Sequence, residues 1–589
     1  MSIEQIIQEN VVTAVKSLFN ENIDTKDVSL QETNKDFKGD LTVVVFPYVR
    51  WAKKSPEQTG EMIGNYLNEN VKEIANFNVI KGFLNLEIDQ SYWLNFLEKQ
   101  KDNANFGKGN QGEKIVLEYC GPNTNKPLHL GHIRNMLIGY ATANLLEYAG
   151  NEVHKVNIYN DRGIAICKSM LAWQKFGEGK TPQSEGIKGD HFVGQFYVKF
   201  DVEYKKEVEK LMTNGTSKED AEKASPLMQE ARKMLQLWEA GDKETVALWG
   251  TMNNWVYQGF EETFEALGVD FEKHYKESEY YERGKELVEE GLKNNKFFKK
   301  EDNSAWVNLE EDGLDQKLLL RGDGTSVYIT QDMGIAEARY NDYQFDQSIY
   351  VVANEQDYHF KVLQHVLQKL EKPYADGIYH LSYGMVDLPE GRMKSREGTV
   401  VDADDLIQEM IDTAEQHTKE LGKIDDLSSE QAQTLFKTLA LGALKYFILK
   451  VNPRKRVIFN PKDSIDFQGN TGPFVQYAHA RIQSLSKNQT LQDVDYSKIQ
   501  LEESEKELLL QLHKFPQVVE LGASGYDVSE IANYVYELAR LFNKFYASVQ
   551  ILKVDNENNK QFRLHLSKFT AETIKKSLAI LGIDAPDKM

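Results

Sequence analysis

The sequence of 589 residues is poor in cysteine: it contains two, Cys120 and Cys167, and neither belongs to a CxxC pair. This scarcity excludes a disulfide scaffold and a thiolate zinc site, and it favours a reducing cytoplasm. Long apolar runs are also absent, so no segment reaches the roughly 18 residues of a membrane span. The first dozen residues contain no Lys or Arg, unlike the basic start of a signal peptide. We therefore expect a cytoplasmic protein that does not enter a membrane.

Positive charge is scarce relative to negative charge. The chain has 70 Lys and Arg against 91 Asp and Glu, which gives a formal net charge of −21. Taken over the whole chain, this charge argues against a nucleic-acid partner, because an acidic protein repels phosphate. The imbalance is uneven, however: residues 451–589 are close to neutral and include the basic run Arg454, Lys455 and Arg456. Local contact with RNA therefore stays possible in this region.

The length and the 41% of hydrophobic residues predict several domains. Residues 1–108 predict a small α+β domain that ends in a polar, glycine-spotted linker. Residues 109–450 predict a Rossmann-like domain with a doubly wound parallel sheet, interrupted by a helical insertion at about 174–250. From about Gln431 the pattern is helical to the end, and residues 451–589 predict an all-α bundle. The fold class is therefore multidomain α/β.

The central domain opens with a βαβ pattern. A β-branched strand over 114–120 is followed by a loop, a helix from Leu128 to Glu147 and a second strand over 152–160. After the insertion, strand signals return at three places, interleaved with helical pattern: 326–330, 346–353 and 377–386. In such a sheet the chemistry is expected where the first strand meets the N-terminus of the following helix.

The motif His129-Leu130-Gly131-His132 occupies that corner. Backbone N–H groups and the dipole at a helix N-terminus favour anions, and each imidazole can donate an N–H to a phosphate oxygen. A glycine between the histidines lets a nucleotide approach the backbone. The pair suits the charge that develops when an α-phosphate is attacked and pyrophosphate leaves. The alternatives are histidines that only cap the helix or that bind a metal.

Two other segments resemble nucleotide-binding motifs but lack a glycine that each motif requires. The run GEGKT at 177–181 lacks the first glycine of a phosphate-binding P-loop, because position 174 is Gln174. The run GDGTSV ends in Val327 where a dinucleotide-binding motif needs glycine, and it is expected to precede a strand. Neither segment predicts a nucleotide site.

The segment LEYCGPNTNKPLHLGHIRN resembles the signature of class I aminoacyl-tRNA synthetases, specifically the bacterial arginyl-tRNA synthetase family. The resemblance extends over the chain through SVYITQD, VVANEQDYH, YGMVDLPEGRMKSREGTV, TGPFVQYAHAR, YELARLFNKFY and GIDAPDKM. It implies an AMP-forming ligase that makes arginyl-adenylate and pyrophosphate from L-arginine and ATP. The arginyl group then passes to the 3′-terminal adenosine of tRNA(Arg), and activation is expected to need bound tRNA. It also implies a monomer, with Mg²⁺ that arrives with ATP and no dedicated protein metal site.

One segment departs from the class I pattern. The second class I signature, Lys-Met-Ser-Lys-Ser, holds the departing pyrophosphate through its second lysine, whose position here is occupied by Ser395. Many members of the arginyl family share this departure and look compensated by a lysine just before the His-x-Gly-His segment, here Lys126. The resemblance thus implies four catalytic residues: His129, His132, Lys126 and Arg392.

The substrate itself constrains its pocket. A guanidinium group is planar and permanently charged, so its selection over an ammonium group requires carboxylates in a forked geometry. By resemblance these are Glu277 and Asp332, with the hydroxyl of Tyr328 beside them. Uncharged amino acids would leave these acids unpaired, so we expect an architectural insertion and no editing domain. By resemblance, three residues bind the α-amino and carboxylate groups of the substrate: Glu118, Asn123 and Gln356. Which of them binds which group stays open.

The other ligands are also assigned by resemblance. The adenine is expected against the backbone near Tyr383, and the ATP-binding residues are His129, Gly131, His132, Gly384, Met385, Val386, Lys394 and Ser395. The N-terminal domain resembles one that contacts the outer corner of tRNA, and the C-terminal bundle resembles an anticodon-binding domain. Exposed aromatic side chains can stack on unpaired bases there. The expected tRNA contacts are Tyr477, Arg481, Tyr546 and Met589.

Two other functions stay open at this point. One is another class I synthetase, such as an enzyme for cysteine, which the lack of zinc-ligand spacing and the presence of Tyr328 and Asp332 disfavour. The other is a catalytically silent RNA-binding paralogue, which Ser395 favours and the intact pair His129 and His132 opposes. Amino-acid-dependent ATP–pyrophosphate exchange distinguishes all three.

Replacing Lys126 by Ala should slow ATP turnover by about 100-fold or more, because one cationic contact to a leaving group typically lowers the barrier by a few kcal/mol. Affinity for tRNA should change little. Exchange kinetics and tRNA binding measure the two effects, with Lys108→Ala in the linker as the control. Near-normal turnover of the Lys126 variant would contradict this role.

Overall fold

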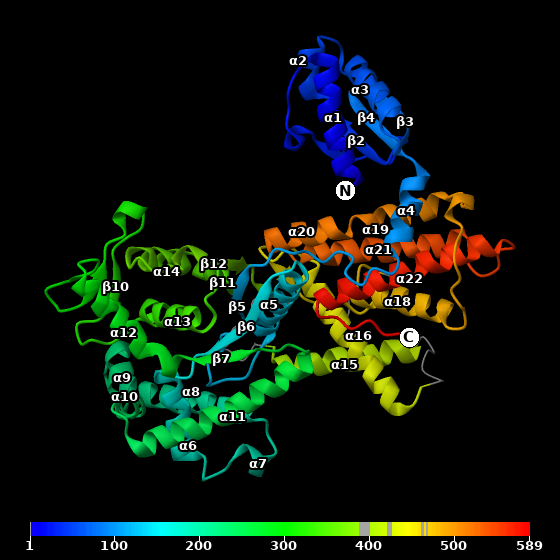
Figure 1. Cartoon of the computed structure of the whole chain (residues 1–589). Helices are drawn as coiled ribbons and strands as arrows, with labels where there is room; N and C mark the ends of the chain where they lie inside the picture. The colour runs from blue at the N-terminus through cyan, green and yellow to red at the C-terminus, as the bar shows by residue number, and fades with distance from the viewer. Residues whose placement is uncertain (1, 388–400, 421–426, 461–463, 467–468) are drawn as a thin grey trace. The chain divides into compact units, whose positions relative to one another are not determined.

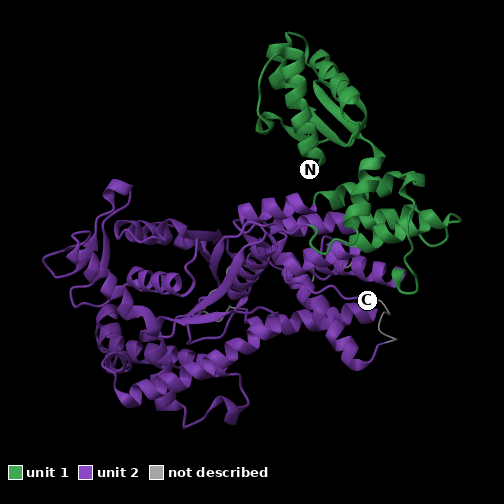
Figure 2. Cartoon of the chain, in the orientation of Figure 1, with its two compact units in different colours: residues 1–106, 486–514, 540–570 green, residues 107–485, 515–539, 571–589 purple. Residues whose placement is uncertain are grey.

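The computed structural model describes most of the chain: residues 2–387, 401–420, 427–460, 464–466 and 469–589. Three residues assigned above, Arg392, Lys394 and Ser395, lie outside these ranges. The chain forms two compact units (Figure 2), of which the first comprises Met1–Phe106, Ser486–Lys514 and Arg540–Thr570 and the second the remainder. No helix of the described residues is long and apolar enough to cross a membrane.

The first unit contains a four-stranded antiparallel sheet in the order β1-β2-β4-β3. Helices α1 (Ile3–Phe19) and α3 (Pro56–Asn70) pack against each other, and α3 packs on the sheet. Gly64 of α3 lies so close to β3 that a Cβ atom there would come within 2.4 Å of the Phe77 ring, so glycine permits this contact. The strands are β1 (Leu30–Glu32), β2 (Leu41–Val44), β3 (Ile74–Ile80) and β4 (Phe83–Ile88).

The same unit contains helices from the C-terminal part of the chain. Helix α4 (Gln90–Gln100) packs against α19 (Glu503–His513). The ring of His513 makes edge contacts with Tyr92, Trp93 and Phe96. Helices α21 (Ser529–Ser548) and α22 (Glu557–Ile580) contribute their residues within 540–570 to this unit.

The second unit is built on a five-stranded sheet in the order β12-β11-β5-β6-β7, in which every neighbouring pair is parallel. Helix α5 (Leu130–Tyr148) lies on one side of it, with α13 (Tyr328–Tyr343) and α14 (Asp357–Lys369) on the other (Figure 1). This confirms the predicted doubly wound parallel sheet. Its strands are β5 (Lys114–Glu118), β6 (Glu152–Tyr159), β7 (Lys273–Lys276), β11 (Gln347–Ala353) and β12 (Ile378–Tyr383).

The region between β6 and β7 is helical, as the sequence predicted. Helices α6, α8, α10 and α11 pack against one another, and α11 continues well beyond the expected end of the insertion. The bounds are α6 (Ile164–Phe176), α7 (Pro182–Glu185), α8 (Gly189–Thr213), α9 (Lys218–Ala224), α10 (Pro226–Glu239) and α11 (Lys243–Leu267).

The strand expected over 326–330 is wrong, because α13 begins at Tyr328. This helix packs tightly against α12 (Glu277–Lys293): a Cβ atom on Gly284 would come within 1.9 Å of the Thr330 carbonyl oxygen. Such close helix packing outweighs the β propensity of the run SVYIT. The run GDGTSV therefore precedes a helix and not a strand.

Three further elements depart from the sequence expectations. A small antiparallel sheet, β10-β9-β8, lies between α12 and α13 and was not predicted. The strand expected over 377–386 divides into β12 and β13 (Val386–Asp387). Strand β14 (Val457–Ile458) pairs with β13 within a stretch that was expected to be helical. The bounds of the small sheet are β8 (Phe298–Lys299), β9 (Ala305–Val307) and β10 (Lys317–Leu320).

The last residues of the chain accept hydrogen bonds from two of the remaining helices of the second unit. Lys445 of α16 donates to the Gly582 carbonyl at 2.5 Å, and Gln476 of α18 donates to that of Asp584 at 2.8 Å. These contacts confirm a helical C-terminal region whose last residues pack on α16 and α18. The bounds are α15 (Ala403–Glu420), α16 (Ser429–Leu449), α18 (Gly472–Ser486) and α20 (Phe515–Gly525).

Arg134 in α5 is fully buried and donates to three carbonyl oxygens from distant segments. Its Nε bonds to Gly384 at 2.7 Å, and its Nη2 bonds to Pro453 at 3.1 Å and to Lys455 at 2.8 Å. The neighbouring Asn135 accepts from the Cys120 N–H at 2.6 Å and donates to the Val351 carbonyl at 2.7 Å. These two side chains join the start of α5 to β5, β11 and the β12–β13 corner.

Replacing Arg134 by Met should lower the unfolding midpoint of the second unit by about 5 °C or more, because buried carbonyls would lose their donor. Differential scanning calorimetry measures the shift. Arg232→Met, an exposed position on α10, is the matched control and should shift the midpoint by no more than about 1 °C. An equal effect of both variants would contradict the anchoring role of Arg134.

Candidate functional site

A cleft of about 880 Å³ lies at the carboxyl ends of the parallel strands. This is the edge at which open α/β sheets bind ligands. The cleft brings together residues that are far apart in the sequence. Its lining includes eleven residues singled out from the sequence: Glu118, Asn123, His129, Gly131, His132, Glu277, Tyr328, Asp332, Gln356, Met385 and Val386.

The signature histidines form a reciprocal cap at the start of α5. The His129 Nδ1 accepts from the Gly131 N–H at 3.1 Å, and the His132 Nδ1 accepts from the His129 N–H at 3.1 Å. Their ring centroids lie 3.9 Å apart. A Cβ atom on Gly131 would come within 2.9 Å of the His129 ring, so this glycine makes room first for the imidazole. The histidines do cap the helix, and both still line the cleft.

Both imidazoles are uncharged near neutral pH. Burial, with a smaller contribution from the Lys126 charge, lowers the pKa of His129 to about 4. Burial and then the neighbouring His129 and Lys126 place the pKa of His132 well below its usual range. Since each Nδ1 accepts a backbone hydrogen bond, the proton must reside on Nε2. The pair therefore offers two neutral N–H donors beside the positive end of the α5 dipole.

Lys126 lies in the loop before the signature, close enough to lower the pKa of both histidines. Burial lowers the pKa of its own ammonium group. It does not line the cleft cavity. The segment after residue 400 pairs with the signature: the Leu130 N–H donates to the Val401 carbonyl at 3.0 Å, and the Ala403 N–H donates to the Leu128 carbonyl at 3.0 Å.

The acidic end of the cleft contains Asp332 and Glu277. Because α13 starts at Tyr328, that residue and Asp332 share one helical face, and the Tyr328 side chain is 81% exposed. Glu277 is the first residue of α12 and is buried. Burial raises its pKa to about 7; Arg162 counteracts this rise, and Asp161 and Asp332 add to it. An incoming guanidinium group would stabilise the ionised form of this carboxyl group.

Three other predicted residues line the same cleft in different settings. Glu118 ends β5 and forms a buried ion pair with Arg339 of α13. Asn123 is exposed in the loop after β5, where it bridges to Asn160. Gln356 is exposed just before α14. The Glu118 carboxylate is thus oriented by a buried cation before any ligand arrives.

Sequence reasoning missed several polar residues of this cleft, among them His359 and Arg162. His359 contacts Asp332, with Nε2 and Oδ2 2.5 Å apart. Burial lowers its pKa, but the hydrogen bond and charge of Asp332 outweigh burial and leave it raised. Arg162 pairs with Glu239 at 3.1 Å and lies over the Tyr281 ring at 4.1 Å. His359 lies in VVANEQDYH, a segment that the family resemblance singled out, so the sequence offered a signal for it. No motif in the sequence pointed to Arg162.

The region expected to face adenine lies at the end of β12. The Gly384 N–H donates to the Pro453 carbonyl at 2.9 Å, and a Cβ atom on Gly384 would come within 2.7 Å of the Lys455 backbone. Met385 is 40% exposed toward the cleft and Val386 is buried in β13. Gly384 itself does not line the cavity. Because Gly384 has no Cβ atom, the segment that contains the basic run can pack directly against it.

The residues expected to contact tRNA lie outside this cleft. The Arg481 guanidinium lies over the Tyr477 ring at 4.7 Å on α18, and Tyr546 on α21 is 43% exposed. Met589 is half-buried at the chain end.

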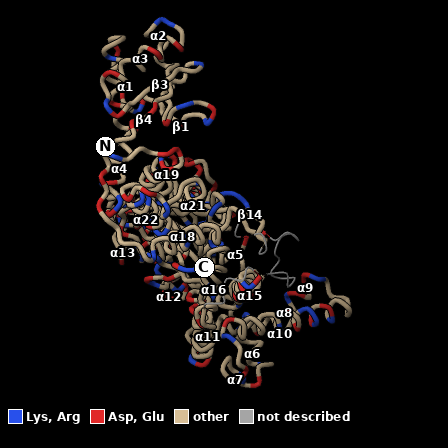
Figure 3. Tube along the Cα trace, turned by 90° about the vertical axis from the view of Figure 1, so that its right-hand side faces the viewer, with Lys and Arg blue, Asp and Glu red and all other residues tan. Residues whose placement is uncertain are grey.

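The basic run that precedes β14 is partly neutralised. Its Arg456 pairs with Asp387 at 2.5 Å, which offsets part of the positive charge of the run. Lys and Arg are interspersed with Asp and Glu along the chain (Figure 3).

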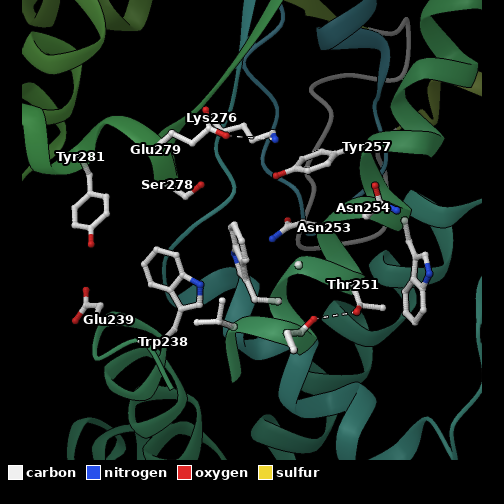
Figure 4. Close-up of a pocket in the computed structure, with 16 residues that line it drawn as sticks. Trp238, Glu239, Thr251, Asn253, Asn254, Tyr257, Lys276, Ser278, Glu279 and Tyr281 are labelled. Carbon is white, nitrogen blue, oxygen red and sulfur yellow. Dashed lines mark hydrogen bonds and ion pairs between the residues drawn. The ribbon is translucent and has the colours of Figure 1, made fainter. Parts of the chain in front are cut away.

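A second cavity of about 1000 Å³ lies between α10, α11 and the start of α12 (Figure 4). Trp238 and Trp249 line it, with centroids 5.5 Å apart, so these aromatic rings already pack on each other. None of the residues assigned from the sequence lines it, although Glu239 borders both cavities. The first cleft is therefore the one that contains the residues assigned from the sequence.

The comparisons with known proteins agree with one another. The family model described as tRNA synthetases class I (R), catalytic domain, matches residues 95–460. A DALR anticodon binding domain matches residues 475–589, and an arginyl tRNA synthetase N terminal domain matches residues 5–88. The chain is similar to the arginine–tRNA ligases of Bacteroides fragilis and Bacteroides thetaiotaomicron, at 53% and 52% identity over 100% of both chains.

Solved structures give the same fold. The arginyl-tRNA synthetase of Thermus thermophilus matches with a TM-score of 0.80 and 22% identity, and that of Plasmodium falciparum with a TM-score of 0.75 and 19% identity. Each match covers 100% of both chains. Since the class I catalytic model spans more than half of the sequence and curated relatives exceed 50% identity over its full length, the chain belongs to the arginyl-tRNA synthetase family.

Proposed function

We propose that the cleft at the strand ends is where this arginine–tRNA ligase forms arginyl-adenylate from ATP and transfers arginine to tRNA(Arg). One observation carries the proposal: the cavity joins two neutral imidazole N–H donors at a helix N-terminus to a pair of carboxyl groups, Glu277 and Asp332. The donors suit a phosphate group that gains charge in the transition state. The carboxyl groups suit a guanidinium group.

In this proposal the two ends of the cleft have separate tasks. His129 and His132 donate from Nε2 to the α-phosphate oxygens as pyrophosphate leaves, and they do so without becoming charged. Lys126 and Arg392 neutralise the leaving group, and Arg392 lies with Lys394 and Ser395 outside the described residues. Gly131, Met385 and Val386 border the nucleoside, and Gly384, which does not line the cavity, supports this segment from behind.

Arginine would bind at the opposite end. Glu277 and Asp332 receive its guanidinium group, and His359 orients Asp332 through their 2.5 Å contact. Tyr328, which lines the cleft and is largely exposed, offers its hydroxyl group beside them. We retain Glu118, Asn123 and Gln356 for the α-amino and carboxylate groups, with Arg339 holding Glu118 in place. An uncharged amino acid would leave the acids unpaired, which explains discrimination without editing.

We further propose that adenylate formation requires tRNA and that Mg²⁺ arrives with ATP, held mainly by phosphates and water. The proposed domains are 1–108 for the outer corner of tRNA, 109–450 for catalysis and 451–589 for the anticodon. Tyr477, Arg481, Tyr546 and Met589 are the proposed tRNA contacts. We propose a cytoplasmic monomer.

ATP–pyrophosphate exchange with each amino acid, with and without tRNA(Arg), tests this proposal. We expect exchange with arginine alone, and at least about tenfold faster with tRNA than without it. Exchange supported by another amino acid, or no exchange under any condition, would overturn the assignment. Uncharged amino acids lack the cation that the acidic end requires.

The KM for arginine should depend on pH through Glu277, whose pKa is about 7. Because a raised carboxyl pKa leaves the group protonated at lower pH, the KM should rise about tenfold between pH 8 and pH 6. Glu277→Gln should raise the KM and flatten this dependence. Glu279→Gln, an exposed neighbour on α12, is the control and should behave like the wild type. An unchanged pH profile in Glu277→Gln would contradict the role.

A further inference from the structure

The first turns of α8, a helix of the insertion, contact the loop before the signature. Gly194 of α8 faces this loop so closely that a Cβ atom would come within 2.9 Å of Pro127 and 3.6 Å of the Lys126 Cα. On another side, a Cβ atom on Gly259 of α11 would come within 2.4 Å of the Asp190 carboxylate. The start of α8 is therefore packed tightly between α11 and the signature loop.

The same turn also pairs with the segment that follows residue 400. The Lys188 ammonium group lies 2.6 Å from Asp404, and the His191 Nε2 lies 3.0 Å from Asp402 and 3.4 Å from Asp404. The Thr263 hydroxyl of α11 donates to Asp404 at 2.9 Å. A lysine and a histidine side chain thus meet two carboxylates in a partly buried setting, where ion pairs are screened less than at the surface.

Asp402 connects these ion pairs with the signature histidines. Its backbone forms an antiparallel bridge with His129. Its Oδ1 caps α15 by accepting from the N–H groups of Asp404 and Asp405 at 2.9 and 3.3 Å. Its Oδ2 faces His191. A movement of this residue would therefore displace the strand-like contact that holds the N-cap of α5.

A metal site is the competing interpretation of this cluster, since ligand atoms of Asp190, His191 and Asp404 lie within 4.8 Å of one another. The Lys188 ammonium group, however, lies 3.5 Å from the buried Asp190 and 2.6 Å from Asp404. It already supplies positive charge where a metal ion would bind, so we interpret the cluster as an ion-pair network.

We propose that the start of α8 is a brace, in which Lys188 and His191 hold Asp402 and Asp404 and so fix both segments around the signature histidines for adenylate formation. His191 and Lys188 are then positioning residues, and the insertion is part of the catalytic framework. This inference rests on the proposed role of His129 and His132. It does not depend on the arginine end of the cleft.

The charges around His191 make the brace sensitive to pH. Lys188 and Asp190 face it from its own helix, and Asp402 and Asp404 face it from the opposite segment. The contact with Asp402 raises the pKa of His191. A raised histidine pKa extends the range over which the imidazole is a cation, and that charge is lost as the pH rises through the raised value. The brace weakens on the alkaline side.

The test is exchange kinetics with tRNA(Arg) in the full-length enzyme, for His191→Ala and Asp402→Asn. Asparagine can still cap α15, so Asp402→Asn removes chiefly the charge. Each variant should lower kcat by about tenfold or more, with the KM for arginine unchanged, because small displacements of catalytic groups are costly. The double variant should be no slower than the slower single variant. His191→Arg keeps a permanent cation; it should restore the rate and sustain it to higher pH than in the wild type.

His154→Ala is the matched control, since this histidine pairs with Glu272 at 2.8 Å near the start of β6. Its kcat should equal that of the wild type. Thermal unfolding of each variant separates a kinetic effect from misfolding, and Asp402→Asn serves if His191→Ala does not fold. A kcat within twofold of the wild type in both variants would overturn the brace. His132→Gln separates the two proposals: if it retains full exchange, the proposed role of the histidines fails instead.

Discussion

The burial of two polar side chains at the start of α5 is the constraint on which the catalytic unit depends. Arg134 and Asn135 are buried among apolar residues of α5, where unsatisfied donors would be costly. Their hydrogen bonds form only when the ends of β5 and β11, the β12–β13 corner and the segment before β14 are all in place. The first three of these segments border the cleft. Formation of these buried hydrogen bonds therefore accompanies assembly of the cleft.

Electrostatics divides the cleft into two halves. At one end, burial keeps His129 and His132 neutral; in the proposed mechanism they donate to phosphate without attracting ATP so strongly that the ground state is favoured. At the other end, burial raises the pKa of Glu277, so its full charge develops only when a cation arrives. Desolvation is the cause at both ends: it lowers the pKa of the two imidazoles and raises the pKa of the Glu277 carboxyl group.

The insertion also acquires a clearer meaning from the structure. Its sequence suggested an architectural elaboration, because it lacks strand signals and known motifs. In the folded protein its helix α8 lies against the signature loop and against residues 402–404. Glycines at 194 and 259 make this approach possible. In the proposed brace, the insertion supports catalysis without supplying any group that touches the substrate.

The sequence by itself determined the βαβ unit and the position of His129 and His132 at its corner, because these depend on local pattern; its family resemblance also supplied Glu277 and Asp332 for the proposed arginine pocket. It could not place α13 at Tyr328, since packing of α12 on α13 overrides β propensity there. Only the tertiary structure decided that His359 contacts Asp332 and that Arg134 joins three segments. Such contacts link residues far apart in the chain, and no local pattern encodes their partners.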